Sequence, residues 1–461
     1  MTIIAIQVEP YVNPFNIIYT NYTLVNKLKI PHNKYLNLSF GNKKIPVRIQ
    51  IGSNKGNSIR IPKNIANELL IPNGIQIHAK YENGTIKLGP LLGILVQNIQ
   101  DNQPKNPLGK FSPFAEELSK KSFTKGLLPF FFTYQDINQE SNYITGWMYR
   151  NSKWEKRKFP ISEVIYNRVS SRVLEKKLLP SITKLKDKYN FIFFNERFLD
   201  KWEIAQMLKP TSVKKIIPKT VIYRGRKTIR EMINSFQTIY LKPTNGALGI
   251  GIFRIEKEEN QYKVQYSRVQ GPITLTFKKF EAMYNYLYPR LALRPYLVQQ
   301  GLKLLSLNNR PIDFRILVQK NSKGIWAVTS MVARIANDQN FVSNLAQGGT
   351  QTTVYEAIKS AKPEFGKIIT KNHFKEIALQ IANIMEKNLP GNFAEFGIDL
   401  ALDEKGKIWL IEVNSKPSKI DDLKDSNEPR PSVTQLANYV LYLSKFLTSK
   451  KHRQKSGVSN V

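Results

Sequence analysis

Two carboxylates and an amide that could bind a metal lie on two neighbouring segments in the C-terminal part of the sequence. Asp399 belongs to the first segment, and Glu412 and Asn414 belong to the second. The intervening residues 404–407 are a turn signal between runs of alternating apolar residues, so the segments are expected to pair as antiparallel strands. A turn at that place sets Asp399 directly opposite Glu412. Facing carboxylates repel each other unless a cation lies between them, and hard oxygen ligands suit Mg²⁺ better than Zn²⁺.

The alternation also predicts which side chains of this hairpin share a face. Side chains two residues apart point to the same side of a strand, which places Leu410 beside the three oxygen ligands. The opposite face would be a continuous apolar surface made by Ile398, Leu400, Leu402, Trp409, Ile411 and Val413. An edge hairpin with a wet acidic face would show the same pattern. The hairpin alone therefore leaves both interpretations open.

A second segment that could do chemistry is the glycine-rich loop between two apolar runs at 239–255. Gly246, Gly249 and Gly251 would let backbone N–H groups approach phosphate oxygens without obstruction by side chains. Lys242, at the end of the first run, could add a positive charge. The spacing matches neither the Walker A pattern nor the dinucleotide fingerprint, and a glycine-rich hairpin turn is the simpler interpretation. Together with the acidic site about 150 residues later, the loop indicates half of a pocket for a nucleoside triphosphate.

These two segments and those between them resemble the ATP-grasp superfamily over roughly residues 200 to 450. Lys242 with the glycine loop resembles its small lobe, and Asp399, Glu412 and Asn414 match its metal triad in order and spacing. Between them, Tyr296–Leu302 is similar to its adenine-holding hinge strand, Pro311–Val318 to its D-x-R strand and Val332–Ala336 to the basic strand that follows. Phe341–Gly349 is similar to a segment of the ATP-grasp enzymes that ligate glutamate to a ribosomal protein.

Across the whole chain the sequence resembles one subgroup, the YheC/YheD-like ATP-grasp proteins, which are described as associated with bacterial endospore coats. Trp147, Trp154 and residues 194–202 contribute to this similarity. The resemblance implies an ATP-dependent ligase, in which a carboxylate attacks the γ-phosphate, becomes an acylphosphate and is joined to an amine. ATP and Mg²⁺ are the implied cofactors, with Mn²⁺ as an alternative metal. The carboxylate, the amine and any spore-coat partner protein are unassigned.

The superfamily's pattern implies a role for each matching residue. Arg315 and Arg334 would be catalytic, because a guanidinium fork can bind two oxygens of the γ-phosphate or the acylphosphate. Asp313 would meet the ribose hydroxyls, and Asn344 would meet a phosphate or a metal-bound water. The other nucleotide-binding residues would be two lysines, the three glycines and the hinge positions: Lys201, Lys242, Gly246, Gly249, Gly251, Gln299, Gln300 and Leu302.

Each of these assignments has a simpler structural alternative. Arg315 and Arg334 could be ordinary arginines on a strand surface. Asp313 could merely pair with Arg315, and Lys201 could be structural, since Asp-Lys pairs are common. The metal triad is the assignment for which a structural alternative is weakest.

The sequence also departs from the superfamily's pattern. Residues 299–300 are Gln-Gln where many relatives carry Gln-Glu or Glu-Glu, so ribose binding would depend on Asp313. Lys416 follows the metal strand where many ligases carry glycine or another small residue, which alters the expected acceptor end. Arg168 and Arg172 are candidates for gripping a substrate carboxylate.

Three classes of function stay open. The first is a working carboxylate–amine ligase, which the complete set of phosphate and metal positions favours. The second is a spore-coat structural protein that binds ATP without turnover. The third is a protein that binds nucleic acid or another polyanion, which a formal charge of +35 would attract. The third is not favoured, because no nucleic-acid-binding motif is recognised and a basic solvated surface explains the charge equally well.

Composition excludes several kinds of site and segment. The chain has no cysteine and four scattered histidines, which excludes disulfides, a thiolate nucleophile and a zinc–thiolate site. No apolar run approaches ~20 residues, and the N-terminus lacks a basic region before an apolar core. We therefore expect no membrane span, no signal peptide and a cytoplasmic location, which the coat-associated resemblance narrows to the mother-cell cytoplasm or the spore coat.

The expected fold class is α/β (α+β), with several packed units in 461 residues. A short helix at Lys63–Leu70 between strands is similar to swapped-hairpin or double-psi barrels. Pro160, Pro180 and Pro210 are expected to break their surroundings into short elements. Further expectations are a buried strand, a helical pair and a C-terminal amphipathic helix: 88–96, 355–389 and 436–447. The expected domains are a β-rich barrel-like domain at 1–88 and a small α/β domain at 89–200. The two α+β lobes of the ATP-grasp fold are expected at 201–450, followed by a basic tail at 451–461.

Overall fold

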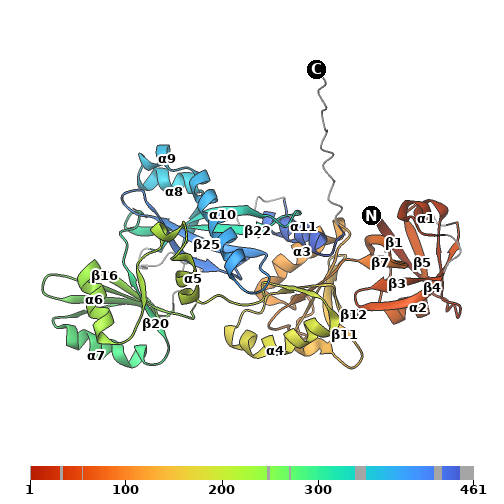
Figure 1. The fold of residues 1–461 in the computed structure, drawn as a ribbon, viewed down its shortest axis with the longest axis horizontal. Helices are drawn as coiled ribbons and strands as arrows, with labels where there is room; N and C mark the ends of the chain where they lie inside the picture. Colours follow the sequence, from red (N-terminus) through yellow and green to blue (C-terminus); the bar gives the residue numbers. More distant parts are fainter. Residues whose placement is uncertain are drawn as a thin grey trace, which may run out of the picture. The chain divides into compact units, whose positions relative to one another are not determined.

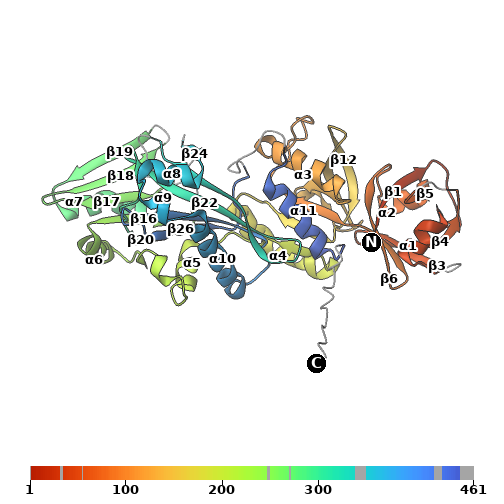
Figure 2. The same ribbon diagram turned by 90° about the horizontal axis from the view of Figure 1, so that it is seen from above.

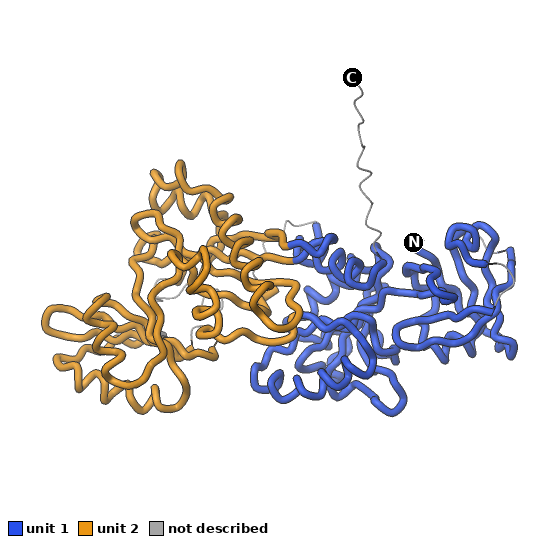
Figure 3. The backbone as a smooth tube through the Cα atoms, viewed as in Figure 1, with its two compact units in different colours: residues 1–194, 320–325, 427–461 blue, residues 195–319, 326–426 orange. Residues whose placement is uncertain are grey.

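A computed structural model describes residues 2–31, 35–53, 56–246, 250–268, 271–337, 349–419 and 428–446. The chain divides into two compact units, which Figure 3 shows in different colours. Unit 1 comprises residues 1–194, 320–325 and 427–461, and unit 2 comprises residues 195–319 and 326–426. Both units combine helices with sheets, which confirms the expected α/β (α+β) fold class. The boundaries of the four expected domains stay a prediction.

Unit 1 begins with a closed seven-stranded barrel, which confirms the expected barrel-like N-terminal region (Figure 1). Every second side chain of its strands points inward, as the period of a strand requires, and these side chains form the barrel core. The strands follow the order β1, β5, β2, β4, β3, β7, β6, and β6 pairs with β1 to close the ring. Their bounds, and those of two short helices, are β1 Thr2–Glu9, β2 Ile17–Thr20, α1 Tyr22–Leu28, β3 Tyr35–Phe40, β4 Lys43–Ile51, β5 Ser58–Pro62, α2 Lys63–Leu69, β6 Gln76–Glu82 and β7 Thr85–Gly89.

The second part of unit 1 is a sheet with the order β10, β11, β9, β8, β13, β14, in which β12 pairs with β11. Strands β9, β8, β13 and β14 run parallel to one another. Helix α11 lies alongside α3 (Figure 2), so this C-terminal helix belongs to the packing of unit 1. The bounds are β8 Leu91–Leu95, α3 Ser112–Thr124, β9 Leu128–Phe132, β10 Ile137–Asn138, β11 Tyr143–Arg150, β12 Lys153–Pro160, β13 Val164–Asn167, α4 Arg172–Tyr189, β14 Ile192–Phe194 and α11 Pro431–Leu443.

Two local expectations for unit 1 are wrong. The apolar run at 88–96 is not one strand, because β7 ends at Gly89 in the barrel and β8 begins at Leu91 in the next sheet. Pro180 lies inside α4 and does not end it. The ring lies on the exposed side of the helix, where water can bond to the carbonyl that proline leaves without a partner.

The first half of unit 2 is an antiparallel sheet with the order β15, β20, β16, β17, β18, β19, against which α6 and α7 pack (Figure 1). The glycine-rich loop joins β16 to β17, which are paired neighbours as the sequence predicts. The bounds are β15 Thr220–Ile222, α6 Arg226–Phe236, β16 Thr238–Pro243, β17 Phe253–Lys257, β18 Tyr262–Arg268, β19 Gly271–Phe277, α7 Phe280–Leu291 and β20 Tyr296–Gln300.

The second half of unit 2 is a sheet with the order β24, β23, β22, β25, β26, in which β21 pairs with β22. Helix α10 buries Phe374, Ala378 and Ile381 in the core of this half. Residues 355–389 are helical as expected, but they form three helices and not a pair. The bounds are α5 Lys201–Leu208, β21 Ser306–Leu307, β22 Arg310–Lys320, β23 Trp326–Ile335, β24 Thr350–Thr352, α8 Val354–Ala361, α9 Phe365–Ile368, α10 Lys371–Asn388, β25 Glu395–Leu402 and β26 Ile408–Asn414.

The hairpin of β25 and β26 has the predicted register at its functional end and a different one beyond it. Asp399 pairs directly with Glu412, as predicted. A register shift then makes Leu400 the partner of Leu410, with Ile411 as the extra residue. Between the extra residue and the turn the register is shifted by one residue, so Leu410 pairs with Leu400 and its side chain joins the core. The predicted apolar face is therefore wrong for two half-buried residues that lie outside that core: Trp409 and Ile411.

Candidate active site

In the second sheet of unit 2, oppositely charged side chains pair with one another across the neighbouring strands β23, β22 and β25. Arg334 on β23 binds both carboxylate oxygens of Asp313 on β22, at 2.6 and 2.7 Å. Arg315, two residues further along β22, donates to both oxygens of Asp399 on β25, and the Nη2–Oδ2 distance is 3.0 Å. Arg334 also approaches Asp399 Oδ2 to 3.1 Å. Two arginines and two carboxylates therefore form one network, which we call the arginine–carboxylate network.

The arginine–carboxylate network is buried, so its charges depend on one another. Arg334, Asp313 and Asp399 are only 5%, 8% and 4% exposed. Burial alone would raise the pKa of Asp399, but the charges of Arg315 and Arg334 outweigh burial and hold this pKa below its usual range. Burial would lower the pKa of Arg334, and the charges of Asp399 and Asp313 raise it instead. Asp399 is therefore a carboxylate at neutral pH, and Arg334 is a guanidinium.

This geometry excludes two of the simpler structural interpretations, those of Arg334 and Asp313. Arg334 is not an ordinary surface arginine, because it is buried between two carboxylates. Asp313 pairs with Arg334 and not with Arg315, because the register of β22 and β25 places Arg315 directly opposite Asp399. Both oxygens of Asp313 are engaged by Arg334. Its contact with a ribose stays a prediction.

Lys201 brings helix α5 to the metal hairpin, because its ammonium group donates to Glu412 Oε1. Lys201 is the first residue of α5, and Asp200 is the N-cap. The Asp200 carboxylate accepts from the backbone N–H groups at 202 and 203, at 2.8 and 3.2 Å. Such a cap satisfies donors at the helix start that otherwise have no partner. The cap therefore fixes where α5 begins and so holds Lys201 beside the carboxylate.

A second lysine approaches the same place from the other sheet of unit 2. Lys242, near the end of β16, donates to Gln299 Oε1 on β20 at 2.5 Å. Gln299 Nε2 in turn donates to Thr220 Oγ1 on β15 at 3.0 Å. Burial lowers the pKa of Lys242 to about 8, and the charge of Lys201 lowers it in the same direction while Glu412 opposes both. Lys242 thus carries a positive charge at neutral pH that it can lose under mildly alkaline conditions.

Four of the predicted residues line one pocket between the two sheets of unit 2. They are Lys201, Lys242, Gln299 and Glu412. The remaining walls are almost entirely apolar, which is typical of small-molecule sites: Ile204, Ala205, Leu208, Ile217, Pro218, Thr220, Leu297, Leu410, Ile411 and Val413. Leu297 belongs to the hinge segment and three others to the metal hairpin, whereas no motif marks the remaining walls in the sequence. The pocket holds about 50 Å³, which is room for only a few waters, so a nucleotide would require the two sheets to move apart.

The oxygens of Asp399, Glu412 and Asn414 form the candidate metal site. Asp399 and Glu412 face each other across the strands, and Asn414 lies two residues further along β26. The Asn414 carboxamide is half-buried and makes no hydrogen bond to the described residues. Among those residues no three histidine or acidic side chains gather as a metal site, so a metal would depend on two carboxylates, one amide and oxygens of a bound ligand. This hard-oxygen set, with Asp399 held ionised, fits Mg²⁺.

The glycine-rich loop can be described in part. Gly251 has φ of +77°, in the left-handed region that glycine adopts without strain. A Cβ atom at this position would also collide with the guanidinium of Arg294, a cation that no motif signalled. A Cβ at Gly246 would meet nothing closer than 3.5 Å. Gly249 lies outside the described residues.

The other predicted site residues are less closely gathered. Gln300 Oε1 accepts from the backbone N–H of Lys219 at 3.2 Å, so its amide is turned toward the neighbouring chain segment. Leu302 is half-buried after the end of β20, and Asn344 lies outside the described residues. The Lys416 ammonium lies 4.7 Å from the centre of the Phe198 ring.

The arginine pair predicted to grip a carboxylate belongs to unit 1. The Arg168 guanidinium lies over the rings of Phe111 and Tyr166, 5.8 and 5.7 Å from their centres. Arg172 is the first residue of α4. Their contribution to the site in unit 2 stays a prediction.

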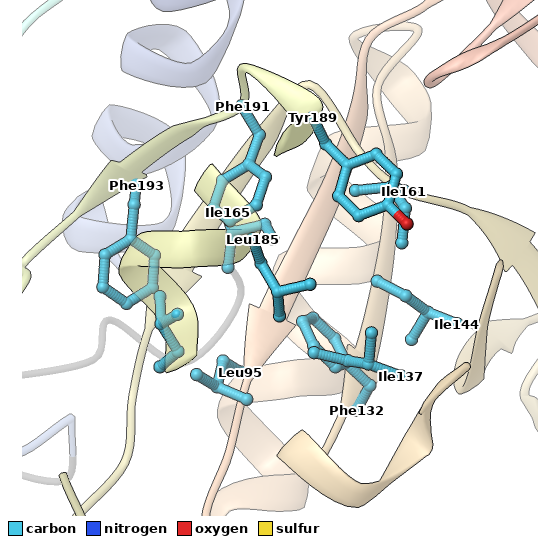
Figure 4. A pocket seen from close by; sticks show the side chains of 11 residues that line it. Leu95, Phe132, Ile137, Ile144, Ile161, Ile165, Leu185, Tyr189, Phe191 and Phe193 are labelled. Atoms are coloured by element: carbon cyan, nitrogen blue, oxygen red, sulfur yellow. The ribbon is translucent and has the colours of Figure 1, made fainter. Parts of the chain in front are cut away.

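A cavity in unit 1 is a packing gap and not a binding site. Figure 4 shows its lining, in which the side chains of Leu95, Phe132 and their neighbours surround the space. Its volume is about 10 Å³, enough for at most one water. The Tyr189 hydroxyl is the single polar group of the lining, and it already donates to Asn142. A water there would lack the partners that buried water needs.

Comparison with known proteins places the chain among ATP-grasp proteins. The model of the YheC/D-like ATP-grasp family matches residues 190–443, which is more than half of the chain. The endospore coat-associated protein YheD of Bacillus subtilis (strain 168) is 28% identical over 388 residues, which cover 83% of this chain and 85% of that protein. The endospore coat-associated protein YheC of the same organism is 23% identical over 322 residues, which cover 69% and 88%.

The solved structures that match the chain include two ligases. The D-Ala:D-Ser ligase VanG from Enterococcus faecalis has a TM-score of 0.45 and 10% identity, and the match covers 77% of this chain and 99% of that one. The ATP-grasp ligase PsnB, complexed with a minimal precursor, has a TM-score of 0.43, 10% identity and the same coverage. In the part of the chain that the structure describes, no helix has both the length and the hydropathy needed to cross a bilayer. With the family model matched across both sheets of unit 2, the chain belongs to the YheC/D-like ATP-grasp family.

Proposed function

We propose that this protein is an ATP- and Mg²⁺-dependent ligase that activates a carboxylate as an acylphosphate and joins it to an amine. The main support is the gathering of opposite charges in unit 2. Lys201 and Lys242 line the pocket, and the arginine–carboxylate network begins at Asp399, directly opposite Glu412. Fixed cations around paired oxygen ligands are what phosphoryl transfer requires, because catalysis there depends mostly on positioning and charge stabilisation.

Each group in this arrangement has a proposed task. Lys242 and the glycine-rich loop hold the α- and β-phosphates, and Gln299 with the apolar walls holds adenine. Asp399, Glu412 and Asn414 hold Mg²⁺, which neutralises charge on phosphate oxygens when bound. Arg315 and Arg334 bind the γ-phosphate; a guanidinium has five N–H donors, so each arginine can keep its carboxylate and still reach a phosphate oxygen.

The reaction needs no side-chain nucleophile. An oxygen of the substrate carboxylate attacks the γ-phosphorus, the bond from that phosphorus to the bridging oxygen breaks, and ADP leaves. The amine nitrogen then attacks the acyl carbon, loses a proton and releases phosphate. In both steps negative charge moves among oxygens beside Arg315 and Arg334, whose positions are fixed in advance by Asp313 and Asp399. Donors held in place before the reaction lower the barrier without the cost of reorganisation.

ADP formation in mixtures of protein, MgATP and candidate substrates tests this function. The relatives named for the endospore coat make coat proteins and their peptides the first acceptors to screen, beside pooled amino acids, and make the mother-cell cytoplasm or the coat the proposed location. ADP formed only when an acceptor is present supports the ligase. Tight MgATP binding without ADP under any condition would instead support an ATP-binding coat protein without turnover.

Glu412→Gln should remove MgATP binding while the fold persists. The amide keeps the size of the carboxylate and can still accept from Lys201, but it removes one of two negative charges from the metal site. We expect nucleotide-free melting within a few degrees of the parent, loss of the MgATP-induced rise in melting temperature, and no turnover. The matched control is Glu404→Gln, an exposed glutamate in the turn of the same hairpin. A Glu412→Gln variant that binds MgATP like the parent would show that the metal triad is misassigned.

Lys242 should make MgATP affinity depend on pH. Its pKa of about 8 means that the nucleotide-free protein loses this charge as the pH rises through 8, whereas bound phosphates would favour the protonated form. Affinity should therefore be full below pH 8 and fall up to about tenfold between pH 7 and 9. Lys242→Arg should flatten this dependence, because arginine stays protonated. Calorimetric titrations at both pH values provide the measurement, and equal slopes for the two proteins would exclude Lys242 as the titrating group.

Arg334→Ala should destabilise the protein as well as slow it, because Asp313 and Asp399 would lose a shared partner in a buried setting. The expected loss of unfolding free energy is about 3–5 kcal/mol, measured by urea denaturation. Arg224→Ala, at an exposed position, is the control and should change stability by less than about 0.5 kcal/mol.

Arg334→Lys separates the catalytic role from the structural one. It keeps a positive charge but cannot bind two oxygens as a planar fork. ADP formation should fall about a hundred- to a thousandfold, with MgATP affinity changed less than about tenfold. Equal rates for this variant and the parent would leave Arg334 with a structural role only.

A further inference from the structure

The outer face of the N-terminal barrel carries tyrosines and arginines in alternation, and the ATP chemistry proposed for unit 2 uses none of them. We propose that this face binds single-stranded nucleic acid, with the tyrosines stacking on bases and the arginines contacting phosphates. The surface is formed by four residues, one on each of four neighbouring strands, which we call the barrel stripe: Tyr35, Arg48, Tyr19 and Arg60.

Strand register places these residues in two facing pairs, which are offset from each other by two residues because Tyr19 lies opposite Gln50 and not Arg48. Tyr35 on β3 is directly opposite Arg48 on β4, and Tyr19 on β2 is directly opposite Arg60 on β5. Strands β3, β4, β2 and β5 are consecutive neighbours around the barrel. Each of the four is flanked along its strand by at least one side chain that is buried in the barrel core: Leu36, Val47, Ile18, Ile59 and Ile61. The two pairs therefore lie on the outside of a closed barrel.

The ring of Tyr35 is accessible to a ligand, whereas Tyr19 and Arg60 are half-buried. Tyr35 is 79% exposed, and Arg48 beside it is exposed. The Arg60 guanidinium lies 5.5 Å from the centre of the Tyr19 ring, and Arg60 is also 3.7 Å from Glu9. This placement keeps the Tyr19 ring and the positive charge of Arg60 together on one surface.

The loop between β1 and β2 extends the stripe with more aromatic surface. Tyr11, 43% exposed, meets Tyr19 edge-on at 6.4 Å between ring centres. Phe15, on the same loop, is 76% exposed. Large apolar side chains scattered singly are normal on protein surfaces, but these two lie on one loop, which contacts Tyr19 of the stripe.

Single-stranded nucleic acid satisfies both kinds of group in the stripe. Its bases present flat faces for tyrosines, and its phosphates present charge for arginines. In a duplex the bases are stacked on one another and offer the rings no partner, whereas an acidic protein would engage the arginines only. Residues 1–88 hold 11 Lys and Arg against 3 Asp and Glu, a net charge of 11 − 3 = +8. Neighbouring strands are ~4.8 Å apart and residues along a strand ~3.3 Å apart, so Tyr35 and Tyr19, two strands and two residues apart, are about 12 Å from each other and would take separate bases.

The test is fluorescence anisotropy of a labelled oligothymidylate of about 20 nucleotides, longer than the 4–16 that a single small barrel covers, titrated with the full-length protein. The parent should bind it with an affinity that falls as salt rises. Tyr19→Ala combined with Tyr35→Ala should weaken binding at least about tenfold. Arg48→Ala should weaken it less and reduce the salt dependence. Tyr288→Ala combined with Tyr355→Ala, two tyrosines 54% and 57% exposed outside the barrel, is the matched control and should bind like the parent.

Several results would overturn the inference. Absence of binding by the parent, or equal binding by the double tyrosine variant with unchanged melting, would remove the role of the stripe. Displacement of the oligonucleotide by polyphosphate at equal phosphate concentration would reduce the interaction to charge alone. A preference for the duplex, or for an acidic protein at matched charge, would assign the surface to another partner. Glu412→Gln should bind the oligonucleotide like the parent, so failure of the ligase proposal and failure of this one are distinguishable.

Discussion

Charges that are buried must be paired, and in unit 2 this requirement fixes how the sheet is built. Arg334 can be buried only because Asp313 and Asp399 flank it, and Asp399 stays ionised because two arginines surround it. Moving any of the three central strands by one residue would leave an unpaired charge in the interior, which costs several kcal/mol. The arginine–carboxylate network therefore specifies register as well as site, and the same pairs that lock β23, β22 and β25 together hold cations ready for phosphate oxygens.

The pocket next to this network depends on two lysines that arrive from different elements. Lys201 is delivered by the capped start of α5, and Lys242 by the end of β16. Burial of Lys242 and repulsion from Lys201 lower the pKa of Lys242 to about 8, because the charge of Glu412 offsets these two effects only in part. A site that holds excess positive charge in the absence of ligand is poised for a polyanion with a divalent cation. The barrel of unit 1 has a different surface chemistry, in which accessible rings accompany the arginines.

Local sequence patterns predicted much of the site. Counting from a turn at 404–407 placed Asp399 opposite Glu412, but this agreement depends on the bulge at Ile411. The pairs between the bulge and the turn are one residue out of the predicted register, and a bulge could not be predicted because it depends on how the strand fits the core. The partner of Asp313 was not predicted either. Strands β22 and β23 are joined by a short connection typical of a hairpin, but which nearby arginine a carboxylate engages depends on side-chain geometry and not on strand order. Apolar pocket walls such as Ile217 and Leu208 carry no motif, and Pro180 was overruled by packing of α4.

The central claim is that facing carboxylates at Asp399 and Glu412 bind a divalent metal together with a nucleotide. Electron paramagnetic resonance of Mn²⁺, used in place of Mg²⁺, measures this directly, because free and bound Mn²⁺ have distinct spectra. With ATP present, the account predicts one tightly bound Mn²⁺ per chain in the parent and a much weaker site in Asp399→Asn. A parent spectrum identical to that of Mn²⁺ and ATP without protein would contradict it.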